Sequence, residues 1–413
     1  MVDTNLYNTL KERGLLYQCT DEKALKEMLE SGKPITVYEG GDPTGDSFHI
    51  GHCVPYFIMR RFQQAGHKVI LLLGGATACV ADPSGKQELR KMLSKEEVAH
   101  NIAKIKETLK IFLDFEGENP PIIVNNADWF KGYDYIDFMR EVGVHFNVNK
   151  MLSSEIYASR IAEGGLTFYE MGYMLMQAYD FIHLNRKYGC TLQYGGQDQW
   201  GNIVAGTELQ RKLNFANGTD INLIGATNPL LLTPEGKKMG KTEKGAIWID
   251  KDKISAFDFY QGIYQTPDAC VEMMFALTTD IPMGEVRALI KEDIIKAKKR
   301  LCFELTKFIR GEQDAIEAQH MSENLFTHGG DDAPEFELER ARAEQGINIC
   351  ELLVETKLCS SKSDARRMIE GGAISMKGEK VNDFSKIVTI SDFENDSILL
   401  KKGKKNFIKV VVK

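Results

Sequence analysis

Two histidines three residues apart stand where a helix is expected to begin. His49 and His52 lie in a glycine-rich segment, 38–52, that precedes an apolar stretch containing Pro55. Proline is typical of a first helical turn, so the helix is predicted to start close to His52. Amide groups at such an end lack partners and carry partial positive charge, which attracts anions. The segment predicts a nucleotide phosphate site, and a structural turn with packed imidazoles is the alternative.

A lysine-rich loop is the second candidate. Lys238 and Lys241 flank a small Met-Gly step in the segment 226–246, which contains proline and glycine and is expected to be mobile. Two ammonium groups there can close over a polyphosphate and stabilise charge that develops on its leaving oxygens. An exposed basic loop without a ligand is the alternative.

A line of polar side chains on an apolar helix is the third. The stretch 166–184 has helical character, and Tyr173, Gln177 and Asp180 follow at spacings of four and three, which places them on one face. A buried carboxylate and amide need hydrogen-bond partners. A ligand with a hydroxyl and an ammonium group would supply them, and the alternative is that other protein groups do.

The elements that position these groups form an alternating pattern. Short apolar runs at 35–38, 69–73, 122–124 and 192–194 are separated by helical stretches, which predicts a parallel sheet covered on both faces. Glycine or polar residues follow each run. The fold class is therefore an α/β, Rossmann-like, doubly wound sheet, and its ligands are expected at the carboxyl ends of the strands.

Composition sets broad limits on the protein. The 413 residues suggest two or three domains, and no apolar run of eighteen or signal-peptide pattern is present, so a cytoplasmic location without membrane contact is expected. Eight cysteines occur without a CxxC pair, and we expect neither disulfides nor a protein-ligated metal. Residues 347–413 hold 13 Lys and Arg against 9 Asp and Glu, a net charge of +4, whereas the total is -7. A basic end on an acidic body favours RNA binding, with a solvated lysine-rich end as the alternative.

The chain is predicted to divide into five parts. The expected ranges are 1–225 for the Rossmann-like catalytic domain, 226–246 for the lysine loop, 247–325 for a helical domain, 326–346 for a polar linker and 347–413 for a small α+β module. In the last part, Ser361 is expected to cap a helix and 373–381 to form a hairpin.

Together these segments resemble the bacterial tyrosyl-tRNA synthetases, a class I aminoacyl-tRNA synthetase family. Residues 48–52 match the HIGH signature and 238–242 look like its KMSKS partner, while YMLMQAYD at 173–180, GQDQWG at 196–201 and DPSGK at 82–86 are more specific. Residues 347–413 look like the family's alpha-L RNA-binding module. Tryptophanyl relatives share the first two signatures but usually lack the other segments.

The resemblance implies roles for individual residues. The side chains that would bind the tyrosine phenol, ammonium and carboxylate groups are Tyr38 and Asp180, then Tyr173, Gln177 and Asp82, then Gln199. Those that would surround ATP and assist catalysis are Gly40, Asp42, Thr44, His49, His52, Lys86, Arg90, Gly196, Asp198, Lys238 and Lys241. The basic residues expected to contact RNA are Arg366, Arg367, Lys401, Lys402, Lys404 and Lys405.

The resemblance also implies the reaction and its partners. L-tyrosine and ATP, which carries Mg²⁺, would form tyrosyl-adenylate and pyrophosphate, and the 3′ end of tRNA(Tyr) would then take the tyrosine on a homodimeric enzyme. A tryptophanyl-type synthetase, a small-molecule nucleotidylyltransferase and a non-catalytic RNA-binding paralogue are the alternatives. Departures from the family pattern are Glu39, where a small residue is common, and Ala78 and Ala81, where glycines are frequent. These departures are expected to affect the affinity for ATP more than the reaction that is catalysed.

Overall fold

Two compact units make up the chain, Met1–Glu312 and Gln313–Lys413. The computed structural model describes residues 2–80, 82–83, 93–234, 236, 238–242, 245–327, 334–377, 379–394, 396–403 and 406–413. Each unit has its own buried apolar core.

A six-stranded sheet forms the centre of the first unit. Its strands are β1 (Gln18–Cys19), β2 (Thr36–Gly41), β3 (Lys68–Leu73), β4 (Ile122–Asn125), β5 (Leu192–Gly196) and β6 (Ile224–Asn228). The order is β1-β6-β5-β2-β3-β4, and every neighbouring pair is parallel except β1 with β6. The predicted doubly wound α/β class is confirmed. Because the order changes direction between β2 and β5, ligands are expected at the carboxyl ends of these two strands.

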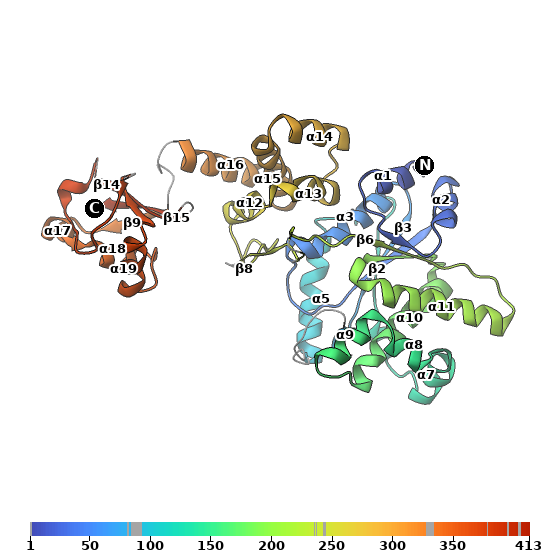
Figure 1. Ribbon diagram of the computed structural model, residues 1–413. Coiled ribbons are helices and arrows are strands. Elements are labelled where there is room, and N and C mark those ends of the chain that lie inside the picture. The colour runs from blue at the N-terminus through green and yellow to red at the C-terminus, as the bar shows by residue number, and fades with distance from the viewer. Residues whose placement is uncertain are drawn as a thin grey trace. The chain divides into compact units, whose positions relative to one another are not determined.

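Helices cover both faces of this sheet (Figure 1). On one face α3 (Ile50–Gln64) places Phe62 against Tyr194 of β5, with ring centroids 5.8 Å apart. On the other face α10 (Phe168–Tyr188) places Phe181 5.3 Å from Tyr38 of β2, and α11 (Trp200–Asn217) packs beside α10. The remaining helices up to residue 163 are α1 (Leu6–Glu12), α2 (Glu22–Glu30), α4 (Thr77–Val80), α5 (Lys95–Leu109), α6 (Ala127–Phe130), α7 (Tyr135–Glu141), α8 (Val148–Leu152) and α9 (Glu155–Glu163).

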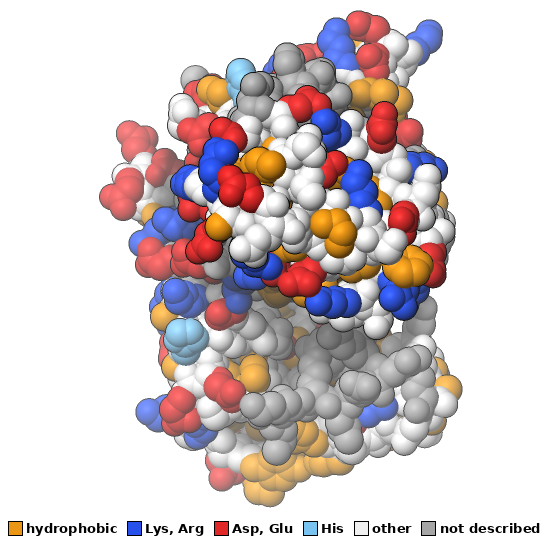
Figure 2. All heavy atoms as spheres, turned by 90° about the vertical axis from the view of Figure 1, so that its left-hand side faces the viewer, with side chains coloured by type: hydrophobic (Ala, Val, Ile, Leu, Met, Phe, Trp, Pro, Cys, Tyr) orange, Lys and Arg blue, Asp and Glu red, His pale blue; other side chains and the backbone are white. Residues whose placement is uncertain are grey.

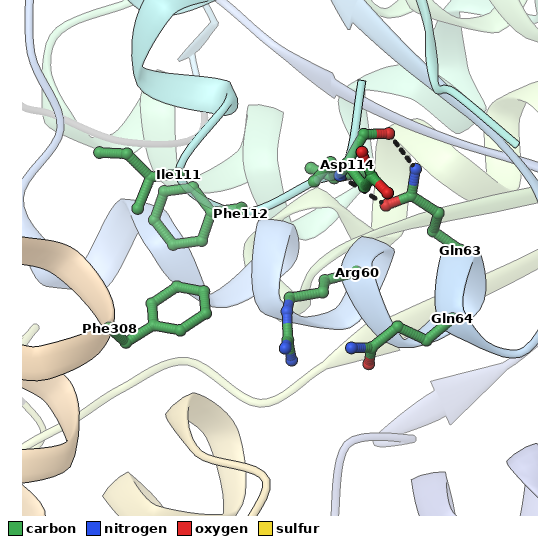
Figure 3. A pocket seen from close by; sticks show the side chains of 8 residues that line it. Arg60, Gln63, Gln64, Ile111, Phe112, Asp114 and Phe308 are labelled. Carbon is green, nitrogen blue, oxygen red and sulfur yellow. Dashed lines mark hydrogen bonds between the residues drawn. The ribbon is translucent and has the colours of Figure 1, made fainter. Parts of the chain in front are cut away.

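Four further helices complete the first unit. They are α12 (Ala256–Tyr264), α13 (Val271–Thr278), α14 (Met283–Glu292) and α15 (Ile294–Arg310). Two buried arginines attach them to the sheet layer, because Arg13 donates to the Thr279 carbonyl at 2.8 Å and Arg61 pairs with Asp280 at 2.7 Å. A pocket of about 330 Å³ lies between α3, the segment after α5 and α15, where Phe112 and Phe308 face each other (Figure 3). None of the predicted site residues lines this pocket.

The second unit combines helices with a small sheet. Its five-stranded sheet has the order β12-β11-β14-β15-β9, formed by β9 (Glu335–Leu338), β11 (Ile374–Met376), β12 (Glu379–Lys380), β14 (Ser397–Lys402) and β15 (Asn406–Val412). The other elements are α16 (Glu312–Thr327), α17 (Arg340–Gln345), β10 (Ile347–Asn348), α18 (Ile349–Glu355), α19 (Lys362–Glu370) and β13 (Ile387–Val388). The predicted cap and hairpin are confirmed, since Ser361 accepts from the Asp364 amide and β11 pairs with β12.

The predicted linker at 326–346 is wrong in its second half. Strand β9 pairs in parallel with β15 over Glu335 to Leu338, and α17 follows it directly. The segment was interpreted as a linker because of its acidic composition, although its residues alternate as in an edge strand, with Glu335 exposed and Leu338 buried. The second unit therefore begins before residue 347, and β9 belongs to its sheet.

Candidate functional site

The first candidate motif forms the beginning of α3, at the carboxyl end of β2. The helix begins at Ile50, so the prediction of a start close to His52 is confirmed, whereas Pro55 lies in the second turn and not in the first. His49 is the cap residue, and its Nδ1 accepts from the Gly51 amide at 3.1 Å. Since this nitrogen accepts, the neutral ring carries its proton on Nε2 and can donate from there. The His52 ring stacks on it at 3.6 Å, so both imidazoles lie at the helix start.

The lysine loop is attached to this helix start by backbone bonds. The amide of Ile50 donates to the Ile247 carbonyl, and that of Ile249 donates to the Phe48 carbonyl, both at 3.0 Å. Gly240 has a φ of +93°, and a Cβ there would lie 3.0 Å from Nδ1 of His49, which only glycine tolerates. The two signatures are therefore in direct contact.

Within the loop, Lys238 has a defined partner. Its Nζ lies 2.7 Å from Oδ2 of Asp198, which follows β5. Lys241 belongs to the short strand β7 (Lys241–Thr242), which pairs with β8 (Gly245–Ala246), and its side chain lies outside the described set. Lys86 and Arg90 also lie outside the described residues.

Tyr38 carries a buried hydroxyl beneath the sheet edge. The side chain is 1% exposed, and its oxygen has no hydrogen-bond partner among the residues that the structure describes. Oε1 of Gln177 and Oε1 of Gln193 are also buried without a hydrogen-bond partner among the described residues. A buried polar atom without a partner costs free energy, about 1–3 kcal/mol. These atoms are thus suited to bind a polar ligand, and Gln193 was not among the predicted residues although it pairs with Tyr38 across the β2–β5 ladder.

Asp180 lies in the same core and accepts two hydrogen bonds. Nε1 of Trp129 donates to Oδ1 at 2.8 Å, and Nδ2 of Asn126 donates to Oδ2 at 3.1 Å. Burial raises the pKa of Asp180 to about 8, although these two donors oppose the shift. Neither Trp129 nor Asn126 was predicted as a site residue. The polar residues Asn125 and Asn126, which follow the apolar run of β4, were the sequence signal that could have identified Asn126.

Asp42, predicted as an ATP contact, binds residues of the polar helix face and of α4. Its Oδ2 accepts from the Tyr173 hydroxyl at 3.0 Å, and its Oδ1 accepts from the Thr77 hydroxyl at 2.7 Å. Gly74 leaves the space for this contact, because a Cβ there would lie 2.0 Å from Oδ1 of Asp42. The structure therefore joins the β2–α3 loop to α10.

The remaining predicted residues line the ends of the same strands. Gln199 donates to Oδ2 of Asp82 at 2.7 Å, which connects the loop after β5 to the segment after α4. Gly40 is the last residue but one of β2 and lies beside the Tyr38 ring, and Gly196 ends β5 next to Asp198. Thr44 is exposed in the turn before α3. All of these side chains belong to loops at the carboxyl edge of the sheet.

Glu39 occupies the opposite face of β2 from Tyr38. Its side chain is 6% exposed, and burial raises its pKa to about 8. Burial, together with the nearby Glu39 carboxyl, raises the pKa of Tyr56 on α3. A neutral Glu39 carboxyl at neutral pH follows from this setting.

In the second unit the predicted RNA-binding residues are partly engaged. Arg366 stacks on Phe384 at 4.3 Å, and Lys401 lies over Phe407 at 5.0 Å. Asp364 pairs with both Arg367 and Lys402. Lys404 and Lys405 lie outside the described residues. On the face shown in Figure 2 basic and acidic side chains are interspersed.

The described part of the chain contains neither a metal-binding cluster nor a membrane-spanning helix. No group of three or more His, Cys, Asp or Glu side chains there could hold a metal ion. No helix in those ranges is both long and apolar enough to cross a membrane.

Comparison with known proteins places this sheet and its signatures in a family. Residues 30–327 match the family model of class I tRNA synthetases (W and Y), and residues 326–410 match the model of the tyrosine-tRNA ligase SYY-like C-terminal domain. The chain belongs to the class I tRNA synthetase family of the W and Y type.

Full-length relatives narrow the assignment. The chain is 46% identical to the "Tyrosine--tRNA ligase" of Acetivibrio thermocellus over 98% of this chain and 99% of the relative. It is 47% identical to that of Clostridium kluyveri over 99% of this chain and 100% of the relative. A C-terminally truncated mitochondrial tyrosyl-tRNA synthetase of Aspergillus nidulans superposes with a TM-score of 0.68 at 28% identity, covering 78% of this chain and 94% of that one. A tryptophanyl-tRNA synthetase of Encephalitozoon cuniculi has the same fold, with a TM-score of 0.55 at 15% identity.

Proposed function

We propose that this protein is a tyrosine-tRNA ligase, which joins L-tyrosine to ATP to give tyrosyl-adenylate and pyrophosphate and then transfers tyrosine to the 3′ end of tRNA(Tyr). The observation that carries the proposal is the buried Tyr38 hydroxyl, which has no partner among the described residues, in the same core as Asp180. A phenol hydroxyl can accept from Tyr38 and donate to Asp180. An indole ring or a phenyl ring cannot satisfy both groups, so the pair favours tyrosine.

The rest of the amino-acid pocket suits a zwitterion. The Tyr173 oxygen and Oε1 of Gln177 offer acceptors for the ammonium group, with Asp82 held beside Gln199. We assign Gln199 to the carboxylate. These roles place the two charged ends of tyrosine toward the carboxyl edge of the sheet, where α3 begins.

ATP with its Mg²⁺ is assigned to the start of α3. Nε2 of His49 and the Thr44 hydroxyl would donate to phosphate oxygens, while Lys238 and Lys241 would neutralise charge on the departing pyrophosphate, and Lys86 and Arg90 would assist. Gly40, Asp42, His52, Gly196 and Asp198 would surround the nucleoside. Catalysis rests on positioning the tyrosine carboxylate against the α-phosphorus and on stabilising the transition-state charge.

The second unit is assigned to tRNA. Its basic residues Arg366 and Lys401 lie on aromatic rings, which leaves guanidinium and ammonium edges for phosphate contacts. A tRNA substrate and eight free cysteines support a cytoplasmic location.

We propose that the active form is a homodimer joined through α7, α8 and α10. Large apolar side chains are exposed there: Tyr135, Ile136, Val144, Val148, Leu152 and Phe168, between 36% and 70%. Figure 2 shows orange side chains gathered at the lower end of the molecule, the end at which α7 lies in Figure 1. Apolar side chains gathered in one region support a partner surface, and a second copy would cover them.

Pyrophosphate exchange tests the proposal directly. Purified protein with ATP, Mg²⁺ and labelled pyrophosphate should incorporate label into ATP with tyrosine, and far less with tryptophan or phenylalanine at equal concentration. Exchange driven by tryptophan or by no amino acid would contradict the proposed specificity.

A further inference from the structure

Thr77, at the start of α4, connects two carboxylates of the site. The side chain is 3% exposed. Its hydroxyl lies 2.7 Å from Oδ1 of Asp42 and 3.0 Å from Nδ2 of Asn126. A carboxylate only accepts and an amide nitrogen only donates, so the single hydroxyl proton of Thr77 goes to Asp42 and its oxygen accepts from Asn126.

The orientation of the Asn126 amide is fixed independently. Its Oδ1 accepts from the Ala76 backbone amide at 2.7 Å, which identifies the other terminal atom as the nitrogen. The two hydrogens of that nitrogen then go to Thr77 and to Asp180. Asn126 is fully buried, so these bonds do not compete with water.

Asp42, which accepts from Thr77 through Oδ1, also accepts a hydrogen bond from Tyr173. The Tyr173 hydroxyl donates its one proton to Oδ2 of Asp42 at 3.0 Å. Because that proton is committed, the Tyr173 oxygen presents lone pairs to any further neighbour. A protonated Asp42 would instead donate to Tyr173 and turn its proton outward, where it would oppose an ammonium group.

We propose that Thr77 is a positioning residue which, with Asn126, keeps both ends of the tyrosine pocket as hydrogen-bond acceptors, Tyr173 toward the ammonium group and Asp180 toward the phenol. This inference rests on the proposed tyrosine pocket. The close packing agrees with it, since a Cβ on Gly74 would lie 2.3 Å from Oγ1 of Thr77.

The test compares Thr77→Val with Thr77→Ser in tyrosine-dependent pyrophosphate exchange. Valine keeps the shape and removes the hydroxyl, so KM for tyrosine should rise about tenfold, while KM for ATP should change less than twofold. Serine restores the hydroxyl and should return KM to within about twofold of the wild type. Thr306→Val is the matched control, because Thr306 is a fully buried threonine of α15 whose hydroxyl has no partner in the described set.

A second readout separates positioning from general damage. The inhibition constant of 3-(4-hydroxyphenyl)propionate, which lacks the ammonium group, should rise much less in Thr77→Val than KM for tyrosine does, because Asn126 keeps its bonds with the Ala76 amide and with Asp180 when the Thr77 hydroxyl is removed. A parallel rise of both constants, an unchanged KM in Thr77→Val, or equal loss in Thr77→Ser would overturn the inference. Thr77→Ala provides the same comparison if Thr77→Val does not fold. Absence of tyrosine-dependent exchange in the wild type would instead overturn the proposed function.

Discussion

Lys238 of the lysine loop donates to Asp198, which follows β5, at 2.7 Å. The Lys238 side chain is 55% exposed, and its ammonium group is held at a residue assigned to the nucleoside. Binding of ATP must exchange this ion pair for contacts with the nucleotide, because Asp198 and the phosphates both attract the same ammonium group.

Replacement of Lys238 should slow adenylate formation. Lys238→Ala removes a positive charge expected to act on the departing pyrophosphate, so the exchange rate at saturating substrates should fall about 100-fold. Tyrosine binding, measured by equilibrium dialysis, should stay within twofold. Lys298→Ala is the control, because Lys298 forms a similar pair with Asp268 outside the site. Equal exchange rates for Lys238→Ala and wild type would refute the assigned role.

Removal of the Tyr38 hydroxyl should have opposite effects on binding and on stability. Tyr38→Phe loses one neutral hydrogen bond to the substrate phenol, so kcat/KM for tyrosine should fall about threefold to tenfold and the preference over phenylalanine should narrow. Without substrate, the variant also loses a buried oxygen that has no described partner. Its unfolding midpoint should therefore equal or exceed that of the wild type. A lower midpoint would indicate that the hydroxyl has a partner in the unliganded protein.

Glu39 should make stability depend on pH. Glu39 in the folded chain holds its proton up to about pH 8, whereas the ordinary pKa of a glutamate, expected in the unfolded chain, is 4.5. The folded state then binds more protons between these values, so this group's contribution to stability falls as pH rises through that window, by about 1.4 kcal/mol per unit.

Denaturant unfolding at pH 5 to 8 measures that dependence. Glu39→Gln cannot ionise, so its free energy of unfolding should fall less steeply with pH than that of the wild type. The other titratable groups are unchanged in this variant and account for the remaining slope. Parallel pH profiles would show that Glu39 is ionised in the folded protein.

Removal of the part of the second unit that follows α16 should separate the two half-reactions. A chain ending at residue 327 lacks the basic module but keeps the sheet, both signatures and α12–α15, so tyrosine-dependent exchange should stay within a few-fold. Charging of tRNA(Tyr) should fall at least tenfold. The cut precedes β9, since a cut at 346 would leave β9 without its β15 partner. Undiminished charging would show that the main tRNA contacts lie elsewhere.

Charge on the exposed apolar surface should disrupt the homodimer. Ile136 and Val144 are 60% and 70% exposed, and burying a lysine ammonium in their place would be costly. Ile136→Lys/Val144→Lys should therefore sediment as a monomer at micromolar concentration. Ile295→Lys is the control, since Ile295 is 55% exposed at the start of α15. A wild type that is itself monomeric would contradict the proposal.

Much of the fold follows from local pattern, and less of the site does. The continuous apolar run of β3 is buried from Val69 to Leu73, which is why its parallel setting was predictable. The spacing of Tyr173, Gln177 and Asp180 likewise identified the inward face of α10. By contrast, the bonds from Trp129 and Asn126 to Asp180 join segments about fifty residues apart, and no periodicity records such contacts.

Two errors came from local rules that the tertiary structure overrides. Pro55 was expected in the first helical turn, but capping by His49 begins the helix at Ile50 and leaves proline in the second turn. The acidic segment before residue 347 resembled a linker because exposed glutamates alternate with Phe336 and Leu338 on an edge strand. In both cases a long-range or capping contact outweighed composition.

The backbone ladder between 48–50 and 247–249 limits how this enzyme can be redesigned. Because the helix-start histidines and the exit of the lysine loop share hydrogen bonds, a chimera that imports only one of the two segments from a relative brings mismatched backbone geometry to that ladder. The proposed ATP site thus depends on a pair of segments almost two hundred residues apart. A chimera of two relatives is expected to preserve function only when both segments are transferred together.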